Sequence, residues 1–198
     1  MANLSNRDIL LGAASRLFRE KGYDGAGLSE ILESSALPKG SLYHYFPGGK
    51  RSLAEAATRA SGDMVEDLID HAFADAGDYD GGGARLCRAI VQRGAQQDHV
   101  LACPVVSILH AGVHDTSLRE IGVKVLAGWR TRLAGHAQRL SHPDPDWAAE
   151  HLIMQIEGAW MMAVAEQGHA PLIRLAQWLE GASTSPRSQD SPETTGQS

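Results

Sequence analysis

The fourteen residues LPKGSLYHYFPGGK, Leu37–Lys50, hold two prolines, three aromatic rings, a histidine, two lysines and three glycines. Pro38 suits the first turn of a helix, where its missing N–H leaves no bond unmade. Pro47 and the two glycines after it break the helical pattern. The stretch therefore predicts a short helix over about Pro38–Tyr45 that carries an unusual concentration of rings and cations.

The charge of the chain is unevenly distributed. Its 198 residues include 18 Lys and Arg against 24 Asp and Glu, a formal net charge of −6. Residues 1–51 hold seven basic and five acidic residues, a balance of +2, and the remaining eleven basic and nineteen acidic residues give −8. This asymmetry indicates an N-terminal end that faces a polyanion, attached to an acidic body.

The composition favours a soluble cytoplasmic protein without a membrane segment. The sequence has no N-terminal run typical of a signal peptide and no uncharged stretch near the ~20 residues that a spanning helix needs. Two cysteines, Cys87 and Cys103, are too few for a disulfide framework, which favours a reducing compartment.

Apolar residues recur at three- and four-residue spacing through most of the chain, whereas strand-like alternation is absent from the sequence. The stretch GDYDGGG, residues 77–83, is predicted to be a linker, and residues 183–198 a disordered tail. The fold class is therefore all-α, with about nine helices predicted over Asn6–Lys21, Leu28–Ser35, Pro38–Tyr45, Lys50–Ala76, Ala84–Gln97, Pro104–His114, Ser117–Leu140, Asp144–Gln167 and Pro171–Glu180.

The first three helices have the layout of a helix-turn-helix, with SSALPKG as the turn between the second and third. Such a third helix meets DNA base edges in the major groove with its N-terminal residues. Lys39 can donate to guanine or to a phosphate, and Gly40 lets the backbone approach closely. The helix residues predicted to contact double-stranded DNA are Lys39, Gly40, Ser41, Tyr43, His44 and Tyr45. Lys50 is expected to meet the DNA backbone at the start of the long helix.

The segment AASRLFREKGYDGAGLSEILESSALPKGSLYHYFPGGK, residues 13–50, resembles the DNA-binding segment of the TetR family of one-component repressors, and KGSLYHYF is its most specific part. The resemblance covers about the first fifty residues, and the remainder matches in helical layout only. FPGGK, with ACPV at residues 102–105, resembles a branch that includes lincomycin- and flavonoid-responsive repressors.

One position departs from the family pattern. The family usually carries Thr or Ser near the start of the second helix, where this chain has Ala26 and Gly27. Ser29 is the nearest hydroxyl, and it is added to the predicted DNA contacts. A missing side-chain cap costs about 1 kcal/mol of helix stability.

The stretch WAAEHLIMQIEGAWMMAVAEQG, residues 147–168, is apolar on nearly all sides, so it must be covered on nearly all sides. One side can pack on its own domain and the other on a partner, as the resemblance implies for the last two helices of a homodimer. A central helix of a monomeric bundle is the alternative. The predicted dimer contacts are Leu152, Ile156, Ala159, Ala163, Ile173 and Trp178.

The resemblance also implies an effector cavity among the middle helices, beside the long connecting helix. The candidates favour an apolar or aromatic effector over a highly charged one, although each of them alone also suits ordinary core packing. They are Leu68, Cys103, Val106, Leu109, His110, Val125, Trp129, Trp160 and Met161.

Metal and catalytic functions have weaker support. His110 and His114 lie four residues apart, with Cys103 and His99 nearby in the sequence, so a zinc or copper sensor is an alternative. No paired-cysteine motif accompanies them, and the catalytic motifs G-x-S-x-G, H-E-x-x-H and the phosphate loop are missing. We expect neither a metal nor a cofactor, and no enzyme.

These observations predict a helix-turn-helix domain over residues 1–50 and a ligand-binding and dimerisation domain over residues 51–182. The predicted function is a repressor that binds a palindromic operator as a homodimer and is released by a small effector. An activator of the same architecture is one alternative. The other is a helical ligand-binding or enzymatic protein whose N-terminal motif serves protein contacts.

Overall fold

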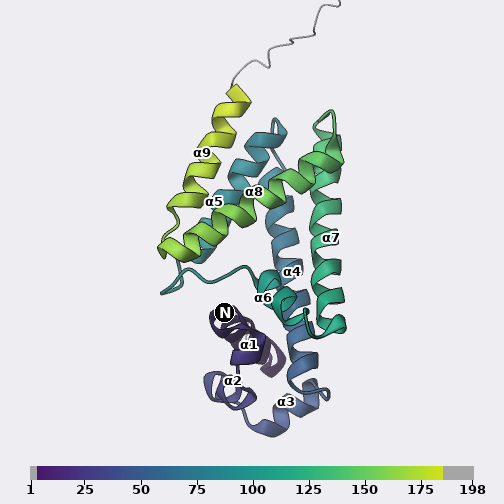
Figure 1. The fold of residues 1–198 in the computed structure, drawn as a ribbon, viewed down its shortest axis with the longest axis vertical. Helices are drawn as coiled ribbons and strands as arrows, with labels where there is room; N and C mark the ends of the chain where they lie inside the picture. Colours follow the sequence, from purple (N-terminus) through teal and green to yellow (C-terminus); the bar gives the residue numbers. More distant parts are fainter. Residues whose placement is uncertain (1–3, 185–198) are drawn as a thin grey trace, which may run out of the picture.

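The computed structural model describes residues 4–184, and these residues form helices and connecting segments without a strand. The helices confirm the predicted all-α class, and Figure 1 shows α1–α3 at one end of the molecule. They are α1 (Asn6–Gly25), α2 (Leu28–Ser35), α3 (Lys39–Tyr45), α4 (Lys50–Phe73), α5 (Tyr79–Gly94), α6 (Pro104–Ala111), α7 (Thr116–Arg139), α8 (Pro145–Glu166) and α9 (Ala170–Thr184).

The helices α1–α3, called the head below, pack around one apolar cluster. Ile31 of α2 and Leu42 of α3 are completely buried, and they meet Leu17 and Phe18 of α1 in the head core. Phe46, directly after α3, is buried in the same cluster. This packing confirms that the apolar side of the short third helix is anchored, which leaves its other side for contacts outside the head.

The turns before and after α3 each depend on an unusual backbone conformation. Ala36 ends α2 in the left-handed region, with φ 52° and ψ 30°, which reverses the chain between α2 and α3. Gly49 precedes α4 with φ 65° and ψ −138°, a combination that is essentially restricted to glycine. Gly49 of the FPGGK stretch thus allows the sharp change of direction from α3 into α4.

The helix α4 runs from the head into the rest of the molecule, called the body below, alongside α7 (Figure 1). Gly62 permits their close approach, because an added Cβ there would lie 2.7 Å from Cγ1 of Val125. The indole of Trp129 donates a hydrogen bond of 3.1 Å to the Gly62 carbonyl. The predicted end at Ala76 is three residues beyond the observed end, Phe73.

The predicted linker over residues 77–83 is wrong, because α5 already begins at Tyr79. The Asp78 side chain caps this helix by accepting a 2.8 Å hydrogen bond from the Gly81 amide. Gly82 and Gly83 are buried, and a Cβ on Gly82 would lie only 2.3 Å from the Phe73 ring. These glycines serve close helix packing rather than flexibility.

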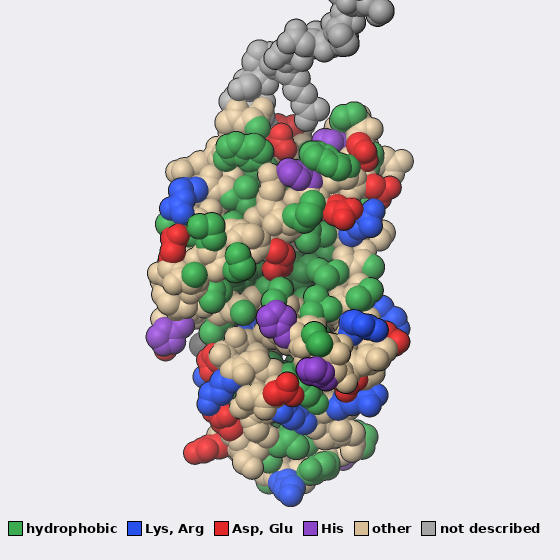
Figure 2. All heavy atoms as spheres, in the orientation of Figure 1, with side chains coloured by type: hydrophobic (Ala, Val, Ile, Leu, Met, Phe, Trp, Pro, Cys, Tyr) green, Lys and Arg blue, Asp and Glu red, His purple; other side chains and the backbone are tan. Residues whose placement is uncertain are grey.

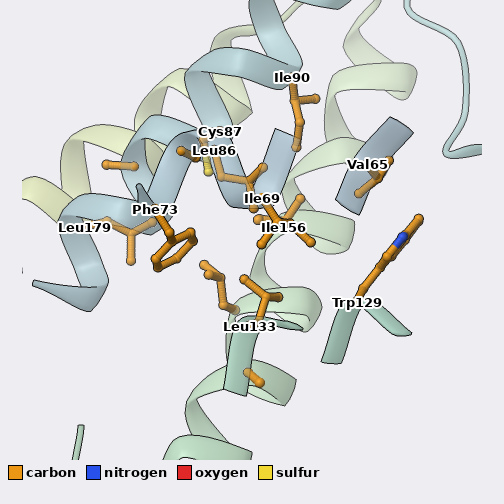
Figure 3. Packing of buried hydrophobic residues seen from close by; sticks show 14 of the residues in the cluster. Val65, Ile69, Phe73, Leu86, Cys87, Ile90, Trp129, Leu133, Ile156 and Leu179 are labelled. Carbon is orange, nitrogen blue, oxygen red and sulfur yellow. The ribbon is translucent and has the colours of Figure 1, made fainter. Parts of the chain in front are cut away.

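The body core forms where α4, α5, α7, α8 and α9 meet. Figure 3 shows side chains from all five helices converging on one volume, with the Phe73 ring among them. The core includes Ile69 of α4, Leu133 of α7 and Leu179 of α9, each 2% exposed or less. Because α5 packs chiefly on α9, and α7 on both α4 and α8, one continuous core holds the body together.

The short helix α6 joins the two cores. Ile108 and Ala111 belong to the head core, whereas Val105 and Cys103 belong to the body core. The helix ends at Ala111, so the prediction that it continues to His114 is wrong. Any shift of α6 would therefore be felt on both sides of the head–body junction.

The last helix is longer than predicted. It includes residues 183 and 184, which were assigned to the tail, while residues 185–198 lie outside the described residues. Within residues 4–184, none of the helices has both the length and the apolar character required to cross a bilayer.

Candidate functional site

The exposed side of α3 is a polar and aromatic surface at the far end of the head. Lys39, Gly40 and His44 are exposed, and Tyr43 and Tyr45 keep 44% and 38% of their surface accessible. An added Cβ on Gly40 would meet nothing within 4 Å, so the start of the helix is open to a close partner. Leu42 holds the opposite side in the head core. The predicted α3 residues are thus exposed, except for Ser41, which is half-buried.

The side chains on this surface are arranged by contacts among themselves. The Lys39 ammonium lies 5.8 Å from the centre of the Tyr43 ring, and the His44 and Tyr45 rings meet edge to face at 4.8 Å. The α3 helix has no side-chain cap at its N-terminus, and the Ser41 amide donates a 2.9 Å hydrogen bond to the Pro38 carbonyl. The surface therefore offers a cation and hydroxyl groups, which are suitable donors for phosphate and base edges.

Two further predicted DNA contacts lie in different settings. Ser29 is exposed in the first turn of α2, and Gly27 supplies no side-chain cap there, as expected from the sequence. Lys50 instead turns back toward the end of α1, where its ammonium lies 4.5 Å from the Tyr23 ring and 3.4 Å from the Asp24 carbonyl. In this arrangement Lys50 links α4 to α1 rather than extending away from the head.

A cavity of about 280 Å³ lies at the junction of head and body. The α1 helix of the head supplies Gly12, Ser15, Arg16 and Arg19, and the remaining walls come from α4, α5, α8, α9 and the segment before α6. Its apolar lining includes Met64, Val65, Leu68, Ile90, Trp160 and Leu172. Its charged or titratable lining consists of Arg16, Arg19, Arg93, His99 and His169.

Only two of the nine predicted effector-binding residues, Leu68 and Trp160, line this cavity. Cys103, Val125 and Trp129 are buried in the body core, with Val106 and Leu109 packed against it. Met161 and His110 are exposed. The arginines were missed because they lie on the polar sides of α1 and α5, and only the three-dimensional fold brings these two helices to one cavity.

The exposed apolar side of α8 and α9 differs from the predicted one. Leu152, Ile156 and Ala163 are buried in the chain's own core, and Ala159 packs against it, so these four do not face outward. Figure 2 shows hydrophobic side chains on the face where α8 and α9 lie. The exposed large apolar residues of these helices are Trp147, Met154, Met161, Met162, Ile173 and Trp178.

Ile173 and Trp178 are therefore the predicted dimer contacts that remain accessible. The four others are covered by the chain's own core. Because α8 is apolar on both sides, its sequence does not show which side the chain itself covers. Trp147, Met154 and Met161 lie on the exposed side of α8 instead.

The histidines and cysteine of the alternative metal site do not assemble into one group. His114 lies beyond the end of α6, so the i, i+4 pair with His110 is not formed on one helix, and His99 lines the cavity. Among residues 4–184 no three His, Cys, Asp or Glu side chains come together in a group that could hold a metal ion. Burial raises the pKa of Cys87 to about 12 and that of Cys103 as well, which keeps both thiols protonated and unreactive at neutral pH.

Comparison with known proteins places this geometry among bacterial regulators. Residues 10–57 match the family model described as bacterial regulatory proteins, tetR family. The chain is 28% identical over 181 residues to the uncharacterized HTH-type transcriptional regulator YxaF of Bacillus subtilis, covering 88% of this chain and 93% of YxaF. The HTH-type transcriptional regulator LmrA of the same organism is 45% identical over 64 residues, which are 32% of this chain and 34% of LmrA.

The whole fold is also found among solved structures. The regulatory protein TetR from Rhodobacter sphaeroides superposes with a TM-score of 0.76 at 27% sequence identity. The match covers 87% of this chain and 95% of that protein, so it includes the body as well as the head.

Proposed function

Starting from the premise that this chain belongs to the TetR family of regulatory proteins, we propose that it is a homodimeric transcriptional repressor released from DNA by a small molecule. It would bind a palindromic operator on chromosomal DNA in the cytoplasm, and it would carry out no catalysis. The effector expected from the sequence is a small apolar or aromatic molecule bound in the body.

The observation that carries this proposal is the exposed side of α3. Leu42 and Phe46 fix the helix in the head core, while Lys39, Tyr43 and His44 remain accessible at the end of the molecule. A short helix that is anchored on one side and presents donors and rings on the other suits insertion into a major groove.

The proposed dimer uses the exposed apolar side of α8 and α9. Large side chains such as Met161, 70% exposed, and Trp178, 59% exposed, are unfavourable in water and gain from burial against a second copy. A two-fold pair would present two α3 helices, and each would reach one half-site of a palindrome, with half-sites about 34 Å apart.

Release would depend on the junction between head and body. Because α1 lines the cavity and α6 packs in both cores, a ligand in the cavity would change how the head sits on the body. The ligand must bind the released arrangement better than the DNA-bound one, and a ~100-fold preference corresponds to about 2.7 kcal/mol.

The test is a gel-shift titration of the full chain on the DNA upstream of its own gene, with Lys39→Ala and Tyr43→Ala as variants. We expect both variants to weaken binding at least about 10-fold, because each loses a contact worth about 1–3 kcal/mol. Lys124→Ala, an exposed cation of α7 in the body, is the matched control and should bind like the parent chain.

Equal binding by the parent chain and both α3 variants would contradict this use of α3. It would favour the alternative in which the N-terminal motif serves protein contacts. A reporter gene placed behind the bound DNA separates a repressor from an activator, since loss of the regulator should raise its expression.

A further inference from the structure

The cavity at the head–body junction has an excess of positive charge. Arg16 and Arg19 reach it from α1 and Arg93 from the last turn of α5, together with two histidines. None of the described residues that line it is acidic. Arg19 is half-buried and Arg93 is exposed, and like charges gathered in the lining of one cavity repel one another. A bound negative group would offset this repulsion, and the described lining residues do not supply one.

Arg19 is a cation of this cavity that has no acidic partner among the described residues. Its Nε donates a 2.6 Å hydrogen bond to the Ala102 carbonyl, and a second guanidinium nitrogen lies 3.4 Å from the Leu101 carbonyl. Within residues 4–184 no carboxylate lies at ion-pair distance from Arg19 or from Arg93. Burial lowers the pKa of Arg19, and the charge of Arg93 acts in the same direction. A guanidinium stays charged nonetheless, so a partly buried cation is left with only neutral partners.

Arg16 is engaged differently. One of its guanidinium nitrogens donates a 2.6 Å hydrogen bond to Ser34, and the other lies 3.5 Å from Glu20. Arg16 therefore links α1 to α2, and the cations available to a ligand are Arg19 and Arg93.

The wall beside Arg19 is already ordered. The Leu101 carbonyl also accepts a 2.9 Å hydrogen bond from the Trp160 indole of α8. The Val100 amide donates a 3.2 Å hydrogen bond to the Gln167 side chain. The segment between α5 and α6 is thus held to both head and body, which positions Arg19 before any ligand arrives. Preorganised donors bind more tightly because less freedom is lost on binding.

The remainder of the lining is mostly apolar. Leu68, Ile90 and Leu172 give the cavity hydrophobic walls, and Trp160 adds an aromatic one. A fully charged metabolite would leave these walls uncovered, while a purely apolar molecule would leave the two arginines without a partner. Only a molecule with both characters satisfies the whole lining.

We propose that this cavity binds a small amphipathic organic anion, with its acid group on Arg19 and Arg93 and its apolar part against Leu68 and Trp160. This inference rests on the proposed regulatory function and defines the chemical class of its effector. This ligand keeps the apolar character that the sequence predicts for the effector, and it carries one negative charge in addition. Because Arg19 belongs to α1 and Arg93 to α5, the acid group would connect the head directly to the body.

The test measures binding to the full chain by calorimetry, without DNA. The probes are octanoate, octyl sulfate and octyl phosphate, each an eight-carbon chain with a different acid group, compared with neutral 1-octanol. We expect at least one anion to bind at least about 10-fold more tightly than 1-octanol, as befits charge-assisted hydrogen bonds to arginine. Comparison of the three anions identifies the preferred acid group.

The variants assign the charge to its residues. Arg93→Gln should weaken binding of the preferred anion about 10-fold and leave binding of 1-octanol unchanged. Arg93→Lys should bind the anion within about 3-fold of the affinity of the parent chain. Arg19→Gln should weaken the anion further and serves as a second variant. Arg59→Gln, an exposed position of α4 that does not line the cavity, is the control.

The outcomes separate this inference from the proposed function. If none of the anions binds better than 1-octanol, or if Arg93→Gln binds them like the parent chain, the anion site is refuted even where operator binding is intact. If the anion binds through the arginines but no duplex DNA is bound, the site stands and the repressor function fails. Release of operator DNA by the preferred anion would support both.

Discussion

Glycine decides how closely α5 can approach α4. The α carbon of Gly82 faces the Phe73 ring, and a Cβ there would lie 2.3 Å from that ring, well inside van der Waals contact. Gly82→Ala should therefore lower the free energy of unfolding by about 1–3 kcal/mol through overpacking. Chemical denaturation followed by circular dichroism measures the change.

Gly135→Ala is the matched control for that substitution. Gly135 lies in the exposed part of α7, where an added Cβ meets nothing within 4 Å. Alanine should raise helix stability there by about 0.5–1 kcal/mol. If Gly82→Ala were as stable as the Gly135→Ala variant, the close packing described for α5 would be wrong.

Asp70 of α4 connects to α7 through two partners. Its carboxylate lies 3.0 Å from His136 Nε2 and pairs with Arg132, which also lies 2.8 Å from Glu66. Burial alone would raise the pKa of Asp70, but the hydrogen bond with His136 and the charge of Arg132 outweigh it and lower that pKa.

A carboxyl group whose pKa is lower in the folded state than in the unfolded state makes the fold more stable at higher pH. The ionised group stabilises the fold above its unfolded pKa of about 3.9, and this contribution is lost as the pH falls through the folded pKa. Asp70→Asn should lower Tm at pH 7, and the difference from the parent chain should shrink below about pH 4. A Tm difference that stays constant from pH 7 to pH 3 would contradict this account.

At the scale of elements, the head was the part most accessible to prediction. The bounds of α2 were predicted as observed, and α3 begins one residue after the predicted start at Pro38. In the head, the apolar periodicity of each short helix ends where a turn residue follows. Few other helix boundaries are therefore compatible with the sequence. The position of Lys50 was not predictable, since its contact with Tyr23 depends on how α4 leaves the head.

The structure of the body was harder to predict, because it depends on contacts between helices that are distant in the sequence. Glycines serve flexible linkers and close helix contacts equally well, so the GDYDGGG stretch was assigned to a linker although α5 begins inside it. The arginines of the cavity come from positions about 75 residues apart in sequence, and only the fold, which brings α1 and α5 to one cavity, shows that they share a site.

The exposed side of α8 and α9 makes a prediction about assembly. Met161→Asp and Trp178→Asp place a charge on the proposed dimer surface, and two-fold symmetry introduces each change twice. Each should weaken dimerisation at least about 100-fold, since loss of a central apolar contact costs 2 kcal/mol or more per site. Sedimentation equilibrium measures the dimer dissociation constant.

Val123→Asp provides the comparison. Val123 is 54% exposed on α7, outside the α8 and α9 surface, and its substitution should leave the dimer dissociation constant unchanged. If Met161→Asp, Trp178→Asp and Val123→Asp all weakened dimerisation equally, or if none of them weakened it, the second copy would not bind at the α8 and α9 surface.

The molecule combines an α3 helix anchored in the head core, an exposed apolar face on α8 and α9, and a cavity lined by both head and body. Each part is defined by separate residues, so each can be altered without the others. Variants of α3 should change DNA affinity alone, those of α8 and α9 should act through assembly, and those of Arg93 should alter the response to an anion.

The most direct measurement is selection of bound sequences from a pool of random duplex DNA by the purified full chain. We predict an inverted repeat whose half-sites are centred about one helical turn, roughly 10 base pairs, or a multiple of it apart. That pattern requires two copies and two α3 helices on one duplex. Enrichment of no sequence, or of a single unrepeated half-site bound by a monomer, would contradict a homodimer that binds DNA through two α3 helices.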